Sequence, residues 1–170
     1  EVERLAKTTG SWAELVGVYG DVLTREQDPQ VQRIVLLKVA RVHDLELRDA
    51  QRAEEAYLRV LQIDEKDTDA LAALDKIYEA AGMFPELAEI LRRRVAVTMD
   101  SEELTSLHFR LGRLYTEALD QPDEAVAAYS TILDGDSRNA KALEALERVY
   151  FKREEFQKLY GVYEKMVDIA

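Results

Sequence analysis

A nine-residue stretch near the middle of the chain, Ala70 to Tyr78, returns almost unchanged 72 positions later, from Ala142 to Tyr150. Both copies space their apolar residues three and four positions apart, which is typical of one face of an α-helix. A helix that recurs at a long fixed interval buries its apolar face against neighbouring units of the same kind. The recurrence therefore predicts stacked helical units and not one compact core.

The rest of the chain carries the same helical spacing, and no window alternates apolar and polar residues as a half-buried strand would. Gly10 and Gly82 follow apolar helical runs and predict helix ends, because glycine readily adopts the left-handed conformation found there. Asp28 before Pro29 predicts a helix start, since the aspartate can cap the first turn and proline loses no hydrogen bond at that position. We expect an all-α chain of about ten helices.

The pattern resembles the tetratricopeptide repeat, a helix–turn–helix unit that stacks into a right-handed superhelix. Residues Leu111 to Tyr115, followed by Ala125 and Tyr129, match the family's Leu-Gly-x-x-Tyr and Ala-x-x-x-Tyr elements. The resemblance covers essentially the whole chain and implies a single α-solenoid domain, with repeats that alternate between 38 and 34 residues. The five degenerate repeats are expected at 1–28, 29–66, 67–99, 100–137 and 138–170. Glu1 falls partway through a helical pattern, so we expect this chain to be a fragment of a longer array.

The resemblance implies a binding face, because in this family the first helix of each pair lines the concave surface where ligands usually lie. One equivalent position of these first helices is basic in every repeat, and further basic residues stand near it. Guanidinium groups form strong paired hydrogen bonds with carboxylates. We therefore expect a protein or peptide segment as the partner, and basic residues at this face would favour an acidic one. The residues predicted to anchor it are Arg41, Lys76, Arg113, Arg148, Lys38 and Arg110.

Two alternatives remain open at this stage. The basic residues can be ordinary solvated charges paired along their own helices, for example Arg148 with Glu144, a pair worth about 0.2–0.5 kcal/mol. The chain can instead be a structural array that self-associates through its ends. The last helix is expected to expose an apolar face unless another repeat or a second copy covers it; that face comprises Phe156, Leu159, Tyr163 and Met166.

Charge and hydropathy argue against two other classes of partner. The net charge of −11 repels phosphate backbones, so nucleic acid is not an expected partner. The longest apolar run, Ile34 to Leu37, is far shorter than the roughly 20 residues that a membrane span needs. The chain has no signal-like start, so we expect no membrane insertion and a cytoplasmic location.

The residue types needed for catalysis or metal binding are sparse. The chain has no cysteine, and its two histidines, His43 and His108, fall in different repeats at framework positions. We therefore expect both to be structural and not metal ligands. The stretch beginning at Asp134 resembles a calcium loop only faintly, because Arg138 occupies a ligand position. The sequence accordingly predicts no catalytic residues, no metal and no cofactor.

Overall fold

The computed structural model describes residues 1–169, which are helical throughout apart from short connections. The chain divides into two compact units, unit 1 (Glu1–Ala81) and unit 2 (Gly82–Ala170). Unit 1 holds α1 (Val2–Thr9), α2 (Trp12–Arg25), α3 (Pro29–Arg41), a π-helix η1 (Val42–Glu46), α4 (Ala50–Ile63) and α5 (Thr68–Ala81). Unit 2 holds α6 (Phe84–Val97), α7 (Ser101–Glu117), α8 (Pro122–Gly135), α9 (Ala140–Lys152) and α10 (Phe156–Ile169). The prediction of an all-α chain is confirmed.

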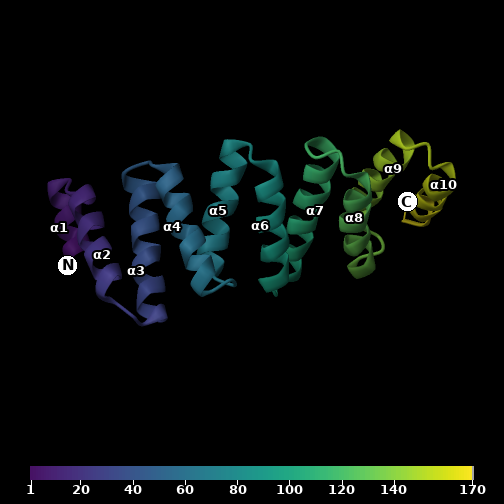
Figure 1. The fold of residues 1–170 in the computed structure, drawn as a ribbon. Coiled ribbons are helices and arrows are strands. Elements are labelled where there is room, and N and C mark those ends of the chain that lie inside the picture. The colour runs from purple at the N-terminus through teal and green to yellow at the C-terminus, as the bar shows by residue number, and fades with distance from the viewer. Residues whose placement is uncertain (170) are drawn as a thin grey trace. The chain divides into compact units, whose positions relative to one another are not determined.

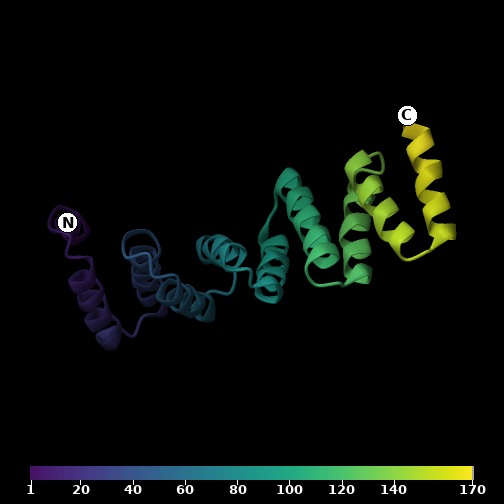
Figure 2. The ribbon, with the colours of Figure 1, turned by 90° about the horizontal axis from the view of Figure 1, so that it is seen from above.

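Within each unit, every helix packs against the next helix in the sequence (Figures 1 and 2). The side chains between them are the apolar residues that the helical spacing singles out. Leu71 of α5 and Leu143 of α9, which are 72 positions apart, are both fully buried. The division into five repeats as one domain stays a prediction.

The backbone repeats at the same interval as the sequence. Left-handed residues follow α1, α5 and α9 in one series, Gly10, Gly82 and Glu154, with φ of 72°, 67° and 57°. A second series, Arg48 and Asp120, follows the first helices of the two longer predicted repeats. Consecutive members of each series are 72 residues apart, so the chain makes the same turn at equivalent positions even where it lacks glycine.

The helix caps recur in the same way. Asp28 and Asp100 accept hydrogen bonds from Gln30 N and Glu103 N, each at 2.8 Å, at the starts of α3 and α7. Asn139 caps α9 by accepting from Ala142 N at 3.2 Å. These short polar side chains satisfy backbone N–H groups that have no partner inside the helix.

The extra residues of the longer predicted repeats lie in the first helix. Helix α7 has 17 residues, whereas α9 has 13. In unit 1 the corresponding extension of α3 is the π-helix η1, where Leu47 N donates to Val42 O at 2.9 Å. Leu119 N donates to Leu114 O at 3.1 Å in the same register of unit 2.

The apolar face predicted for the last helix is present only in part. Phe156 is 63% exposed and Tyr163 is 42% exposed, while Met166 is half-buried. The prediction that Leu159 is exposed is wrong, since it is only 6% exposed. Leu159 is buried because α10 packs against α9. Among residues 1–169, no helix combines the length and apolar character that crossing a bilayer requires.

Candidate functional site

A groove of about 940 Å³ lies between α7 and α9 in unit 2. Its aromatic part is formed by Phe109 and Tyr129, whose ring centroids are 6.1 Å apart at an interplanar angle of 55°. Five basic and four acidic residues line it: Arg110, Arg113, Arg138, Lys141 and Arg148, with Glu102, Glu117, Asp136 and Glu144. A hollow that combines aromatic surface with converging charged groups can hold an extended peptide segment.

Three of the six predicted anchors, Arg110, Arg113 and Arg148, line this groove. Arg113 lies 3.9 Å from Glu117, and Arg148 lies 4.0 Å from Glu144, in both cases one helical turn along the same helix. Both guanidinium-bearing side chains are largely exposed. Such long, solvated pairs are worth little, so these arginines can exchange their partner for a ligand carboxylate at small cost.

The anchors predicted in unit 1 lie in a different setting. Lys38 and Arg41 line a smaller pocket of about 210 Å³ that also includes Trp12. Lys38 Nζ lies 2.5 Å from Glu3 Oε1, and it stands 6.0 Å from the centroid of the Tyr19 ring. Lys76 is exposed on α5. These cations are therefore not in the groove of unit 2.

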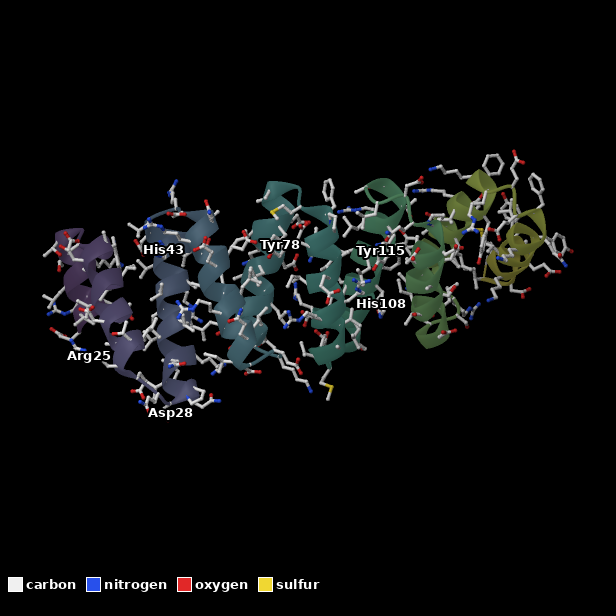
Figure 3. The ribbon with its side chains drawn as sticks, in the orientation of Figure 1. Arg25, Asp28, His43, Tyr78, His108 and Tyr115 are labelled. Atoms are coloured by element: carbon white, nitrogen blue, oxygen red, sulfur yellow. The ribbon has the colours of Figure 1, made fainter. Side chains whose placement is uncertain are left out.

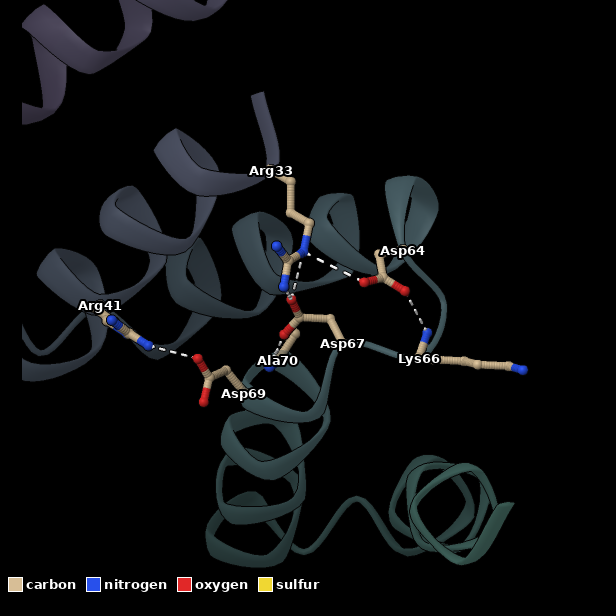
Figure 4. Close-up of polar contacts among 7 residues, drawn as sticks. All are labelled: Arg33, Arg41, Asp64, Lys66, Asp67, Asp69 and Ala70. Atoms are coloured by element: carbon tan, nitrogen blue, oxygen red, sulfur yellow. Dashed lines mark hydrogen bonds and ion pairs between the residues drawn. The ribbon is translucent and has the colours of Figure 1, made fainter. Parts of the chain in front are cut away.

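The counterpart of the groove in unit 1 is crossed by ion pairs (Figure 4). Arg33 of α3 contacts the carboxylate of Asp67, with Nε and Nη2 at 2.7 and 2.5 Å from Oδ2. Asp67 is only 2% exposed, and its other oxygen accepts a hydrogen bond from Ala70 N at 2.8 Å at the start of α5. Arg41 pairs with Asp69 at 2.8 Å. These contacts tie α3 to the beginning of α5.

Unit 2 has different residues at the positions 72 further on. Thr105 stands where unit 1 has Arg33, and Lys141 stands where unit 1 has Asp69. Threonine cannot form the ion pair of Arg33, and Lys141 adds a positive charge beside Arg113 instead of neutralising it. The positions of unit 2 that match Arg33, Asp67 and Asp69 therefore hold Thr105, Asn139 and Lys141, which cannot form the same ion pairs. A position-by-position comparison of the two sequence copies is the signal that would have revealed this difference.

A second, more apolar pocket of about 490 Å³ adjoins the groove in unit 2. Leu104, His108 and Ile132 contribute to its walls, and Figure 3 labels His108 on α7. The histidine is half-buried, and its Nδ1 atom is buried without a hydrogen-bond partner. His43 is buried in η1 with the same unpartnered atom. Both histidines lie on helices within the packed units, as the sequence predicted.

Acidification is expected to destabilise the fold through these two histidines. Burial lowers the pKa of both His43 and His108; for His43, Arg52 lowers it further while Asp49 and Glu55 oppose the shift. Their protons therefore bind more tightly to the unfolded chain, where the pKa is about 6.5. The contribution of the two neutral imidazoles to the free energy of unfolding is therefore present above about pH 6.5. It is lost as the pH falls below that value.

Urea unfolding at about pH 7.5 and about pH 5.5 measures this loss, in a range where most carboxylates stay ionised. Replacing His108 with leucine, the residue at the equivalent position 36 of unit 1, removes one of the two titrating groups. The variant should show a smaller loss between the two pH values. An unchanged loss would assign the pH dependence to other groups.

No group of three or more histidine, aspartate or glutamate side chains in the described part of the chain is arranged to hold a metal ion. The polar clusters of unit 1 are ion pairs between opposite charges, as Figure 4 shows for Arg33 and Asp67. What the groove of unit 2 offers is charge and shape for a ligand.

Comparison with known proteins identifies the repeat. Residues 70–105 match the family model described as tetratricopeptide repeat. The solved structure of MamA is 15% identical with a TM-score of 0.55, covering 99% of this chain and 94% of that one. MamA from Desulfovibrio magneticus RS-1 gives 16% identity and a TM-score of 0.52, covering 99% and 90%. YrrB, described as a TPR protein with an unusual peptide-binding site, gives 13% identity and a TM-score of 0.54, covering 89% and 74%.

No curated protein sequence matches the chain. At identities this low the structural similarity establishes the fold alone, and that fold is the α-solenoid of helix pairs that the sequence predicts. The family model adds a recognisable repeat of its own. Residues 70–105 thus match the tetratricopeptide repeat, and the chain has the all-α fold of the solved structures of MamA and YrrB.

Proposed function

We propose that the chain is a non-catalytic protein-interaction scaffold, and that the groove between α7 and α9 binds an acidic segment of a partner protein. The observation that carries the proposal is the contrast between the two units. Arg33 and Asp67 cross the groove of unit 1, whereas the matching place in unit 2 is open and lined by Arg113, Lys141 and Arg148. YrrB, described as a TPR protein with an unusual peptide-binding site, shares the fold.

The charge of the groove differs from that of the whole chain. The chain has a net charge of −11, yet basic residues outnumber acidic ones along this groove. The basic side chains of the groove attract carboxylates, while the net negative charge of the whole chain disfavours extended phosphate backbones. Because stacked helices hold the groove in place, most of the conformational entropy lost on binding is lost by the bound segment, and the scaffold loses little.

Charge reversal tests the proposal directly. The probe is a fluorescein-labelled peptide of alternating glutamate and serine, and its affinity is measured by fluorescence anisotropy. Changing Arg113 and Arg148 to glutamate should weaken binding at least about tenfold, which corresponds to about 1.4 kcal/mol. The control changes Lys66 and Lys165 to glutamate, because both are exposed and neither lines the groove. If the two variants lose the same affinity for the peptide, the effect comes from the net charge of the protein and not from the groove.

A graft from unit 1 tests the same site without reversing the arginines. The changes Thr105→Arg, Asn139→Asp and Lys141→Asp reproduce the ion-pairing residues Arg33, Asp67 and Asp69. Because these residues already connect two helices in unit 1, the grafted chain should fold with unchanged helicity by circular dichroism. Peptide binding should fall to the level of the charge-reversed variant. Full binding by the graft would contradict the assignment of the groove.

The self-association alternative has an observation of its own. Helix α10 exposes Phe156, Tyr160 and Val167, which are 63%, 65% and 75% exposed. An apolar surface of this kind is typical of a face that packs against another unit or another copy. Light scattering separates the two functions. Self-association is favoured if the molar mass of the particle rises with protein concentration. Changing Phe156 and Tyr160 to serine should then lower that mass. The cytoplasmic location stays a prediction.

A further inference from the structure

The apolar pocket of unit 2 and the basic groove are neighbours that share one rim. Glu102, Thr105 and Asp136 line both hollows. Beyond that rim the pocket is lined by Leu104, Ile132 and His108. A chain lying in the groove can therefore place one side chain in the pocket.

The pocket results from three small residues. Gly135 stands where unit 1 has Ile63, Thr131 where it has Arg59, and Thr105 where it has Arg33. Each substitution removes a long or branched side chain from the same corner of the helix pair. At these three positions the side chains of unit 2 are therefore shorter than those of unit 1.

The lining of the pocket selects against a carboxylate and for an apolar group. Glu102 and Asp136 at the rim repel a second carboxylate, whereas Leu104 and Ile132 gain from contact with an aliphatic chain. The volume of about 490 Å³ exceeds that of one side chain and so admits leucine, isoleucine or methionine without strain. The charge pattern therefore changes from basic to acidic between the groove and the pocket.

Resting on the proposed function, we infer that the partner segment combines a carboxylate for Arg113 and Arg148 with an aliphatic side chain that enters the pocket. Arg113 follows Thr105 by eight positions on α7, which is about 12 Å along the helix axis. An extended peptide covers about 3.3 Å per residue. The aliphatic residue consequently lies three or four positions from the acidic residue.

Designed peptides test the spacing. The probes are capped glycine–serine peptides that carry two adjacent aspartates and one leucine placed one to six positions away, with a matched set carrying serine for leucine. Binding measured by anisotropy should be tightest at a spacing of three or four. At that spacing, replacing leucine with serine should weaken binding at least about tenfold, as expected for loss of a buried leucine.

Filling the pocket tests its location. A Cβ atom added at Gly135 meets nothing within 4 Å, and the backbone there is not in the left-handed region, so we expect Gly135→Ile to fold normally. This variant has the isoleucine that unit 1 has at Ile63. It should bind the leucine peptide and the serine peptide with equal affinity, and that affinity should equal the one the wild type shows for the serine peptide. Thr131→Leu narrows the same pocket from an exposed position and should have the same effect. The control is Gly161→Ile on α10, which is also sterically free but lies outside the pocket.

Each outcome has a distinct meaning. If leucine gives no advantage in the wild type but charge reversal of Arg113 and Arg148 still abolishes binding, the pocket is wrong and the acidic groove stands. A leucine advantage that persists in Gly135→Ile places the leucine elsewhere and also overturns the inference. If no acidic peptide binds with or without leucine, the proposed function falls and this inference falls with it.

Discussion

Leu71→Ala is expected to lower the free energy of unfolding by about 2–5 kcal/mol. Leu71 lies on α5 with none of its surface exposed, and it belongs to the largest fully buried side chains of the described chain. Alanine removes most of that side chain from a closely packed interior and leaves a cavity that the surrounding helices fill only in part. Urea unfolding followed by far-ultraviolet circular dichroism measures the loss.

The control for this prediction is Leu45→Ala in the same unit. Leu45 is 67% exposed, so its truncation should change the free energy of unfolding by less than about 0.5 kcal/mol. Leu143, the equivalent residue of α9, is also fully buried and should respond as Leu71 does. If Leu71→Ala and Leu45→Ala have the same effect, burial is not what stabilises this position.

Gly112→Ala is expected to destabilise the chain by about 1–3 kcal/mol, although alanine is normally the better helix former. A Cβ atom at Gly112 would lie 2.5 Å from the Cε1 and Cζ atoms of the Tyr129 ring. The ring cannot move away easily, because Tyr129 is buried and also contacts Phe109. Thermal and urea unfolding both report this loss.

Two further variants isolate the cause. Gly17→Ala on α2 has no atom within 4 Å of the new Cβ and should stabilise the chain by about 0.5–1 kcal/mol. Tyr129→Leu should reduce the cost of Gly112→Ala, since leucine lacks the ring that the new Cβ atom would meet. A cost that is the same with and without the ring would show that the close approach is not responsible.

The sequence predicted the helices well because their signals are local. The glycine stop at Gly10, the cap at Asp28 and the apolar spacing each act within a few residues, and the structure contains all three. The 72-residue interval also predicted the equivalence of Leu71 and Leu143. Such features do not depend on how distant helices meet.

The setting of the basic residues was not predictable in the same way. Aligning Arg41 with Arg113 treats them as one kind of anchor, yet Arg41 pairs with Asp69 of another helix while Arg113 faces an open groove. The difference arises from position 141, where lysine replaces the equivalent Asp69. A charge is neutralised by its neighbours in space, so its own repeat position cannot reveal its state.

One repeat position, the residue just before the basic position of each first helix, varies between repeats. It is glutamate at positions 3 and 147, aspartate at 75 and glycine at 112. The Tyr19 hydroxyl donates to Glu3 at 2.8 Å and the Tyr163 hydroxyl donates to Glu147 at 2.9 Å, whereas Tyr129 packs directly on Gly112. Tyr19 and Tyr163 are thus held by a hydrogen bond, whereas the equivalent Tyr129 is held by close packing.

The recurring left-handed turn at Gly10, Gly82 and Glu154 would allow the chain to change length in steps of 72 residues. Removing residues 11–82 would join Gly10 to Met83 through a backbone turn that already exists at both places. Duplicating the same segment would lengthen the array by the same step. A gene rearrangement that joins the chain at these turns can therefore add or delete a whole 72-residue unit while the backbone geometry of the junction is preserved.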